Sequence, residues 1–130
     1  MNHPLDYLAL AAAGGLGVLL RAGCNTLAVR LAGPTSTWAA PATTLTINVA
    51  GSFLFGLLYA LMAGKPGLGP AWQTIVLVGL LGGFTTYSTF AFQAIELAGH
   101  GHLAGAIGYV AATNVLALIA VWVGLRLPTG

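Results

Sequence analysis

This sequence is poor in charge and in cysteine. Of its 130 residues 5% are charged, with four Lys or Arg and two Asp or Glu, and it has one cysteine. Soluble globular domains carry roughly 25% charged residues, so an ordinary soluble domain is excluded. The net charge of +2 is too small to form a clustered basic face, and we expect no nucleic-acid partner. Cys24 has no second cysteine to pair with, and we expect it to be buried as a small apolar residue.

Long apolar runs take the place of the missing charge, since 58% of the residues are hydrophobic. Short Gly, Pro and polar stretches separate runs at about 5–31, 43–63, 72–97 and 103–127. Each run reaches the roughly 20 residues that a helix needs to cross the hydrocarbon core. The sequence therefore predicts an all-α membrane protein. We expect residues 1–130 to form a single transmembrane bundle of four helices, a multi-pass protein of the cell (inner) membrane surrounded by lipid.

The first run could be taken for a secretory signal. Its leader, residues 1–6, has no Lys or Arg and carries Asp6, which is a poor match to a positively charged n-region. We therefore interpret the run as a mature helix. An even number of spans leaves both termini on one side of the membrane.

Positive charges at the two ends of the bundle are balanced. Lys65 and Arg126 belong to the end that carries the termini, and Arg21 and Arg30 belong to the other end. Such a balance gives no orientation bias under the positive-inside rule. It favours a chain that inserts both ways and pairs as an antiparallel dimer. The alternative is that four charges are too few to indicate an orientation.

Many polar side chains fall at membrane depth, where they need partners in protein or in a wet cavity. Asn48 lies near the midpoint of the second run and offers two N–H donors without a charge. It can serve an ion path, or it can simply hydrogen-bond a neighbouring helix. The other polar groups at this depth are Asn25, Thr44, Thr46, Ser52, Thr85, Thr86, Ser88, Thr89, Thr113 and Asn114.

The third run carries poor helix formers in mid-membrane, with two glycines at 82–83 and two threonines at 85–86. This pattern predicts a break in the third helix, which would free main-chain carbonyls. Such carbonyls are hard oxygen ligands suited to Na⁺. Beyond the break, Tyr87 and Phe90 are three residues apart and share a helix face. Their positive ring edges can favour an anion, although such a pair also forms by ordinary packing.

Three stretches carry a family resemblance. Residues 82–90, GGFTTYSTF, resemble the GGFTTFSTF signature of the Fluc (CrcB) fluoride channels. Residues 44–51, TLTINVAG, are similar to the TLxVNxxG stretch of that family, and residues 14–21, GGLGVLLR, to its GGxxGAxxR opening. The resemblance covers essentially the whole chain. Departures include Tyr87, where phenylalanine is usual, and Leu81, where cysteine is common.

The resemblance implies an antiparallel, dual-topology homodimer with two pores that export fluoride passively. It implies a central Na⁺ held by the main-chain carbonyls of Gly82 and Thr85, two from each subunit. Arg21 matches the arginine near the vestibule. The fluoride-pore residues that it implies, together with the neighbouring hydroxyls of the third run, are Asn48, Tyr87, Ser88, Thr89, Phe90, Tyr109 and Thr113.

Other classes make different demands on the sequence. A small dual-topology drug/proton antiporter, the main alternative, needs a carboxylate inside the membrane, whereas Asp6 and Glu96 lie near predicted helix ends. A structural membrane module without transport would use Asn48 only for packing. An enzyme is disfavoured because the hydroxyls at depth have no paired base. His100 and His102 could bind a metal, but their flanking glycines favour a solvated turn.

Overall fold

The computed structural model describes residues 1, 3–33, 35–63 and 69–127. Within these ranges the chain is all-helical, as expected, and four helices are long and apolar enough to cross a membrane: Pro4–Ala32, Ala39–Met62, Pro70–Gly99 and Leu103–Arg126. The first, second and fourth are the continuous helices α1 (Pro4–Ala32), α2 (Ala39–Met62) and α6 (Leu103–Arg126). The third span consists of α3 (Pro70–Gln73), the π-helix η1 (Thr74–Leu81), α4 (Gly82–Phe84) and α5 (Tyr87–Gly99).

Local sequence explains where the first two helices begin. At the start of α1, the side chain of His3 accepts a hydrogen bond from a main-chain N–H, and the Asp6 carboxylate accepts one from the His3 N–H at 3.2 Å. This is a capping box with a helix-starting proline beside it. The second helix begins at Ala39, before the expected residue 43, because Pro41 lies in its first turn, where no N–H is needed.

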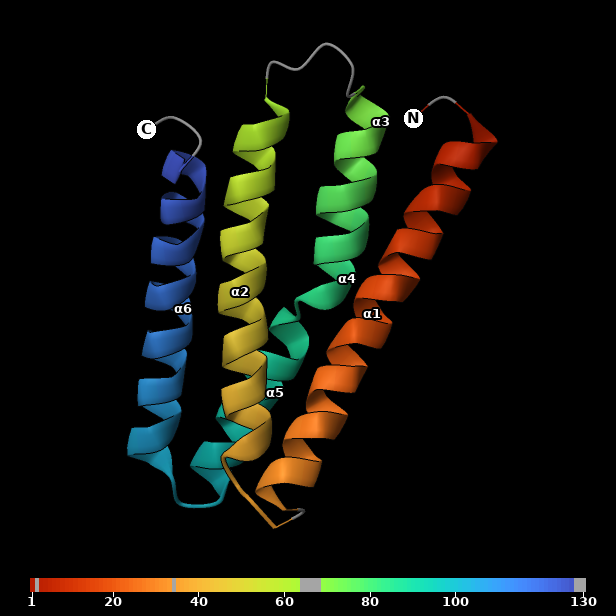
Figure 1. Cartoon of the computed structure of the whole chain (residues 1–130). Coiled ribbons are helices and arrows are strands. Elements are labelled where there is room, and N and C mark those ends of the chain that lie inside the picture. The colour runs from red at the N-terminus through yellow and green to blue at the C-terminus, as the bar shows by residue number, and fades with distance from the viewer. Residues whose placement is uncertain (2, 34, 64–68, 128–130) are drawn as a thin grey trace.

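Figure 1 shows how the spans are arranged: α2 packs along α6, α1 lies against η1 and α4, and α5 lies against α2 and α6. Both termini are at the same end of the bundle. Glycines bring α2 and α6 into main-chain contact. A Cβ on Gly56 would overlap the Val121 carbonyl, and a Cβ on Gly124 would overlap the Phe53 carbonyl. Small residues thus allow the two helices to approach closely.

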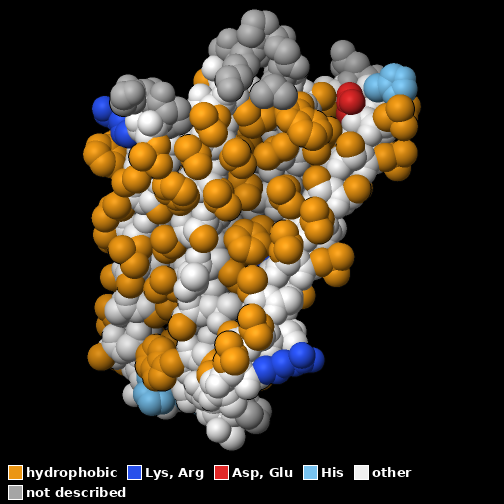
Figure 2. Space-filling model, in the orientation of Figure 1, with side chains coloured by type: hydrophobic (Ala, Val, Ile, Leu, Met, Phe, Trp, Pro, Cys, Tyr) orange, Lys and Arg blue, Asp and Glu red, His pale blue; other side chains and the backbone are white. Residues whose placement is uncertain are grey.

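The outer surface is largely apolar, and the charged side chains visible in Figure 2 lie at the two ends of the molecule. The buried core is a cluster between α5 and α6 that includes Phe90, Leu97 and Tyr109. By contrast, α1 is the most exposed span, and Leu19 is 70% exposed. Cys24 is exposed as well, so the expectation that it is buried was wrong. It lies on a helix that contacts the rest of the chain along one side only.

Candidate functional site

Regular helical structure in the third span stops after Phe84 and resumes at Tyr87. Thr85 has φ −81° and ψ 160°, and Thr86 has φ −152° and ψ 120°, both extended conformations. The glycines at 82–83 remain helical, so the extended backbone falls on the two threonines. Their β-branched side chains are suited to that conformation.

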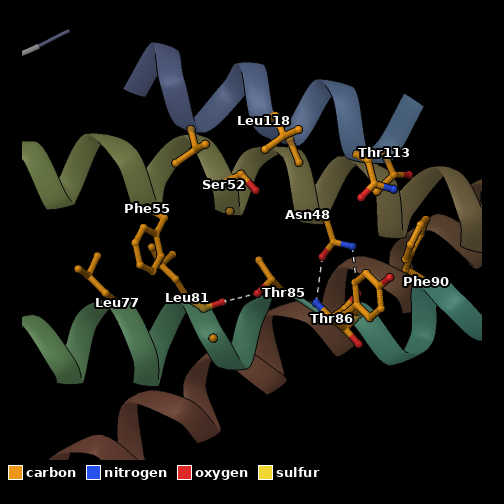
Figure 3. Close-up of a pocket in the computed structure, with 16 residues that line it drawn as sticks. Asn48, Ser52, Phe55, Leu77, Leu81, Thr85, Thr86, Phe90, Thr113 and Leu118 are labelled. Carbon is orange, nitrogen blue, oxygen red and sulfur yellow. Dashed lines mark hydrogen bonds between the residues drawn. The ribbon is translucent and has the colours of Figure 1, made fainter. Parts of the chain in front are cut away.

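Asn48 of α2 binds the main chain at this point (Figure 3). Its Nδ2 donates to the Thr86 carbonyl at 3.0 Å, and its Oδ1 accepts from the Thr86 N–H at 2.9 Å. A carboxamide presents a donor and an acceptor side by side and can therefore replace both partners that a helix would supply. Main-chain groups left unpaired at membrane depth are costly. Asn48 thus stabilises the extended segment.

The hydroxyl of Thr86 caps α5. It accepts from the Thr89 N–H at 3.3 Å and donates to the Thr89 hydroxyl at 3.1 Å. The Ser88 hydroxyl lies 3.4 Å from the same oxygen. Three hydroxyls therefore gather at the start of α5.

Several main-chain carbonyls lose their usual helical donors where the helix is interrupted, and those of Gly82 and Thr85 are among them. The Gly82 carbonyl would accept from the Thr86 N–H, but that group donates to Asn48. The Thr85 carbonyl would accept from the Thr89 N–H, but that group donates to the Thr86 hydroxyl. Gly82 and Thr85 are the two residues whose carbonyls the sequence resemblance assigns to a cation.

Three aromatic rings form a chain from the surface into the bundle. The ring centroids of Tyr87 and Phe90 are 5.4 Å apart at an interplanar angle of 56°, and those of Phe90 and Tyr109 are 5.2 Å apart at 55°. These tilted arrangements direct a positive ring edge toward a neighbouring ring face. Tyr87 is 76% exposed, whereas Phe90 is 4% exposed. Despite their shared spacing, the two rings therefore have different surroundings within one chain.

Buried polar groups continue inward from Phe90. The Tyr109 hydroxyl donates to Gln93 Oε1 at 2.9 Å. The hydroxyls of Thr44 and Thr113 are buried and find no hydrogen-bond partner among the described residues, although Thr44 neighbours the Tyr109 hydroxyl. Two unpaired buried hydroxyls in one small bundle need an explanation, because each loses its bonds to water without replacement.

These groups come from three helices at one-turn intervals. The pairs are Thr44 and Asn48 on α2, Phe90 and Gln93 on α5, and Tyr109 and Thr113 on α6. We call these six residues the polar column; Phe90 belongs to it through its ring edge. Sequence reasoning missed Gln93, although its position three residues after Phe90 puts it on the same helix face.

A cavity of about 410 Å³ lies between α2, α6 and the third span, next to the polar column (Figure 3). Among the predicted site residues, those that line it are Asn48, Gly82, Thr85, Tyr87, Phe90 and Thr113. Tyr109 lies behind Phe90, and Ser88 and Thr89 remain at the start of α5. Thr86, Ser52 and Asn114 add polar atoms to the lining.

Arg21 lies apart from this cavity. It is half-buried on α1 and forms no ion pair with any residue that the structure describes. One turn further along the helix, the Asn25 Oδ1 is buried and lacks a hydrogen-bond partner among those same residues. The structure therefore does not bring Arg21 into the group that surrounds Asn48.

The chain is similar to known proteins along nearly its whole length. The family model described as "CrcB-like protein, Camphor Resistance (CrcB)" matches residues 8–125. A protein of Paracoccus denitrificans (strain Pd 1222) is 43% identical over 132 residues, which cover 100% of this chain and 98% of that protein. One of Saccharophagus degradans is 40% identical over 121 residues, with coverages of 93% and 87%. One of Rhizobium meliloti (strain 1021) is 38% identical over 127 residues, with coverages of 98% and 96%. All three carry the name "Fluoride-specific ion channel FluC".

Proposed function

This chain belongs to the CrcB family, and we propose that it is a fluoride-specific ion channel that lets fluoride leave the cell passively. It is a channel and not an enzyme. It is a multi-pass membrane protein, and its relatives are bacterial, which corresponds to the inner membrane. The antiporter alternative requires a carboxylate inside the membrane. Neither acid in the sequence meets that requirement, because Asp6 lies in the first turn of α1 and Glu96 is exposed near the end of α5.

The observation that carries the fluoride path is the polar column. Fluoride is small and strongly hydrated, so a dry path must replace its water with short hydrogen bonds. Asn48 uses one N–H on Thr86 and keeps a second one, while the hydroxyls of Thr44 and Thr113 have no other partner among the described residues. An ion passing these donors would complete their hydrogen bonds.

The chemistry of the column also favours release. Its donors are an amide and hydroxyls, and no Lys or Arg belongs to it. A full positive charge in the path would hold the anion, whereas conduction requires that each site bind weakly enough to let it go. The edge of the Phe90 ring carries a partial positive charge and adds a weaker attraction for the anion. Arg21 acts outside the column, where it raises the anion concentration at a vestibule.

We further propose that two copies pair in antiparallel orientation. Supporting this, the cavity exposes Ser52 and Asn114 at membrane depth, where polar groups need a protein partner. Tyr87 is exposed in the single chain and would be covered by a second copy. The charge balance that favours insertion both ways includes Lys65, which lies outside the described residues.

The dimer would hold Na⁺ at its centre through the carbonyls of Gly82 and Thr85, two from each copy. The fit rests on the loss of helical donors at both carbonyls and on their position in one cavity. Hard oxygen ligands suit such a cation. When bound, Na⁺ supplies a positive charge shared by the two chains. In Na⁺, the detergent-solubilised dimer should therefore dissociate at a higher temperature than in N-methylglucamine, and equal dissociation temperatures would contradict the proposal.

Liposomes test the central function. Vesicles containing purified protein and loaded with fluoride should release it to a fluoride electrode once the membrane potential is clamped, while chloride-loaded vesicles should not release chloride. Protein-free vesicles give the background leak. No fluoride release above that leak would overturn the channel assignment, and comparable chloride release would overturn its selectivity.

Orientation has its own test. A cysteine placed at the C-terminus of a Cys24→Ser chain should react with an impermeant thiol reagent in part from outside the vesicle and in full after lysis. In a dual-topology protein about half of the termini face each way. Labelling from one side only would contradict the antiparallel dimer and would leave the fluoride assignment intact.

A further inference from the structure

A second cavity, of about 280 Å³, lies at the end of the bundle opposite the termini. Its walls are the hydroxyl residues 35–37 of the connection between α1 and α2, together with Glu96 from the last turn of α5 and His100, the C-cap residue of that helix. Pro41 and Leu97 are buried at its inner side. The cavity is thus polar toward solvent and apolar toward the protein.

The polar column begins one helical turn from this cavity, beyond the buried Pro41 and Leu97. Thr44 is three residues after Pro41 on α2, and Gln93 is four residues before Leu97 on α5. Residues at these spacings lie one turn apart on the same helix face. The hydroxyl of Thr44 is buried there without a hydrogen-bond partner among the described residues. The cavity and the column therefore follow one another along the same two helices.

The charge at this cavity is unfavourable for an anion. Glu96 is one of the two acids in the sequence, and the other, Asp6, belongs to the opposite end. An exposed carboxylate lowers the local concentration of anions around it. His100, one turn further on and lining the same cavity, adds a compensating positive charge when it is protonated. The other ionisable groups described toward this end are Arg21 and Arg30, on α1, and His102, whose ring centroid is 6.0 Å from that of Trp38.

We propose that this cavity is the mouth of the fluoride path at the end opposite the termini, and that Glu96 limits fluoride entry there while protonated His100 relieves that limit. The inference rests on the proposed fluoride conduction and adds to it a site and a charge control. It assigns Glu96 and His100 to ion entry and leaves selectivity to the polar column.

Charge substitution gives the first test. Two unit charges about 8 Å apart in water interact strongly enough to change a local ion concentration about two- to threefold. Fluoride efflux through Glu96→Gln should therefore rise about two- to threefold over the wild type at low ionic strength. The gain should disappear near 0.5 M salt, where screening acts within a few ångströms. Glu96→Asp keeps the charge and should behave as the wild type.

Titration gives the second test, because histidine changes charge between about pH 5 and 8. Efflux through the wild type should rise up to about twofold from pH 7.5 to pH 6 after subtraction of protein-free leak. His100→Gln should lose this rise. His102→Gln, the matched control on the neighbouring turn, should keep it.

A thiol placed at the mouth separates charge from bulk. In a Cys24→Ser background, Glu96→Cys should conduct faster after a positively charged methanethiosulfonate and more slowly after a negatively charged one of similar size. Leu5→Cys, exposed at the other end of the bundle, should respond to neither reagent.

If wild-type efflux is present but Glu96 variants and both reagents leave it unchanged at low salt, the mouth assignment is wrong. If the wild type itself does not conduct fluoride, the proposed function fails first.

Discussion

The two halves of the third span pack against their neighbours by different means. The half before Thr85, made of η1 and α4, meets α1 at glycines where main chain lies directly against main chain. A Cβ on Gly83 would overlap the Gly14 carbonyl, and a Cβ on Gly17 would overlap the Leu80 carbonyl. At these two positions the neighbouring atoms belong to the main chain, which cannot turn aside as a flexible side chain could. The half is held as a rigid support.

The half after Thr86, α5, packs through side chains. The Phe90 ring lies against Tyr109, and Gln93 accepts the Tyr109 hydrogen bond, while Thr44 of α2 is buried nearby without a partner among the described residues. These are the groups that we assign to the ion path. The difference indicates that one half fixes the position of the main chain and the other provides the donors. Substitutions before the extended segment should therefore affect folding most, and substitutions after it should affect conduction most.

The largest effect is expected in the supporting half. Gly17→Ala places a methyl group against the Leu80 carbonyl and should lower the free energy of unfolding in detergent by about 3 kcal/mol. Gly15→Ala is the matched control, since nothing lies within 4 Å of the position that its Cβ would take. Thermal unfolding monitored by size exclusion compares the two. Equal stability of both variants would show that α1 and the third span are not fixed by main-chain contact.

At the junction of the two halves, Asn48→Ala should affect both properties. It leaves the Thr86 N–H and carbonyl without their partners, which should cost about 2 kcal/mol, and it removes a donor from the path. Fluoride efflux should fall at least tenfold. Asn114→Ala is the control for stability, because Asn114 donates only to the Val110 carbonyl of its own helix. A stable Asn48→Ala channel with normal efflux would contradict both roles of this side chain.

Within the donor half, Tyr109→Phe should have a smaller effect on stability. It leaves Gln93 Oε1 without its donor and should lower the free energy of unfolding by about 1 kcal/mol. Fluoride efflux should fall severalfold, because the Gln93 amide is no longer held in place. Tyr59→Phe, at an exposed tyrosine of α2, should change neither quantity. If the two variants behave alike in vesicles, the Tyr109 hydroxyl does not belong to the path.

The same division between the two halves of the third span shows how much of the structure could be predicted from the sequence. Hydropathy and run length predicted the four long helices, because crossing a membrane requires a long apolar segment in every helical fold. Asn48, Phe90 and Thr113 were recognised from motif resemblance, and the structure brings them to one cavity. The roles of these residues in conduction stay predictions.

The features that the sequence did not predict depend on contacts between residues that are distant in the chain. Glycine-rich composition suggested that the interruption would include Gly82, yet the glycines are helical, and Gly83 is in close contact with α1. The extended residues are instead Thr85 and Thr86, and Asn48 from another helix pairs the main chain of Thr86. Gln93 was missed for the same reason, since its significance comes from Tyr109, 16 residues away.

The smallest expected change in stability is also the sharpest test of the comparison. Thr113→Val replaces a buried, unpartnered hydroxyl by a methyl group of the same size, so the free energy of unfolding should stay constant or rise by up to about 1 kcal/mol. If fluoride completes the hydrogen bond of that hydroxyl, efflux should nevertheless fall about tenfold, as expected for one bond to a charged group. Thr46→Val is the control, because that exposed hydroxyl donates to the Ala42 carbonyl of its own helix. Purely structural packing predicts that activity follows stability, whereas an ion path predicts that the two move in opposite directions at Thr113.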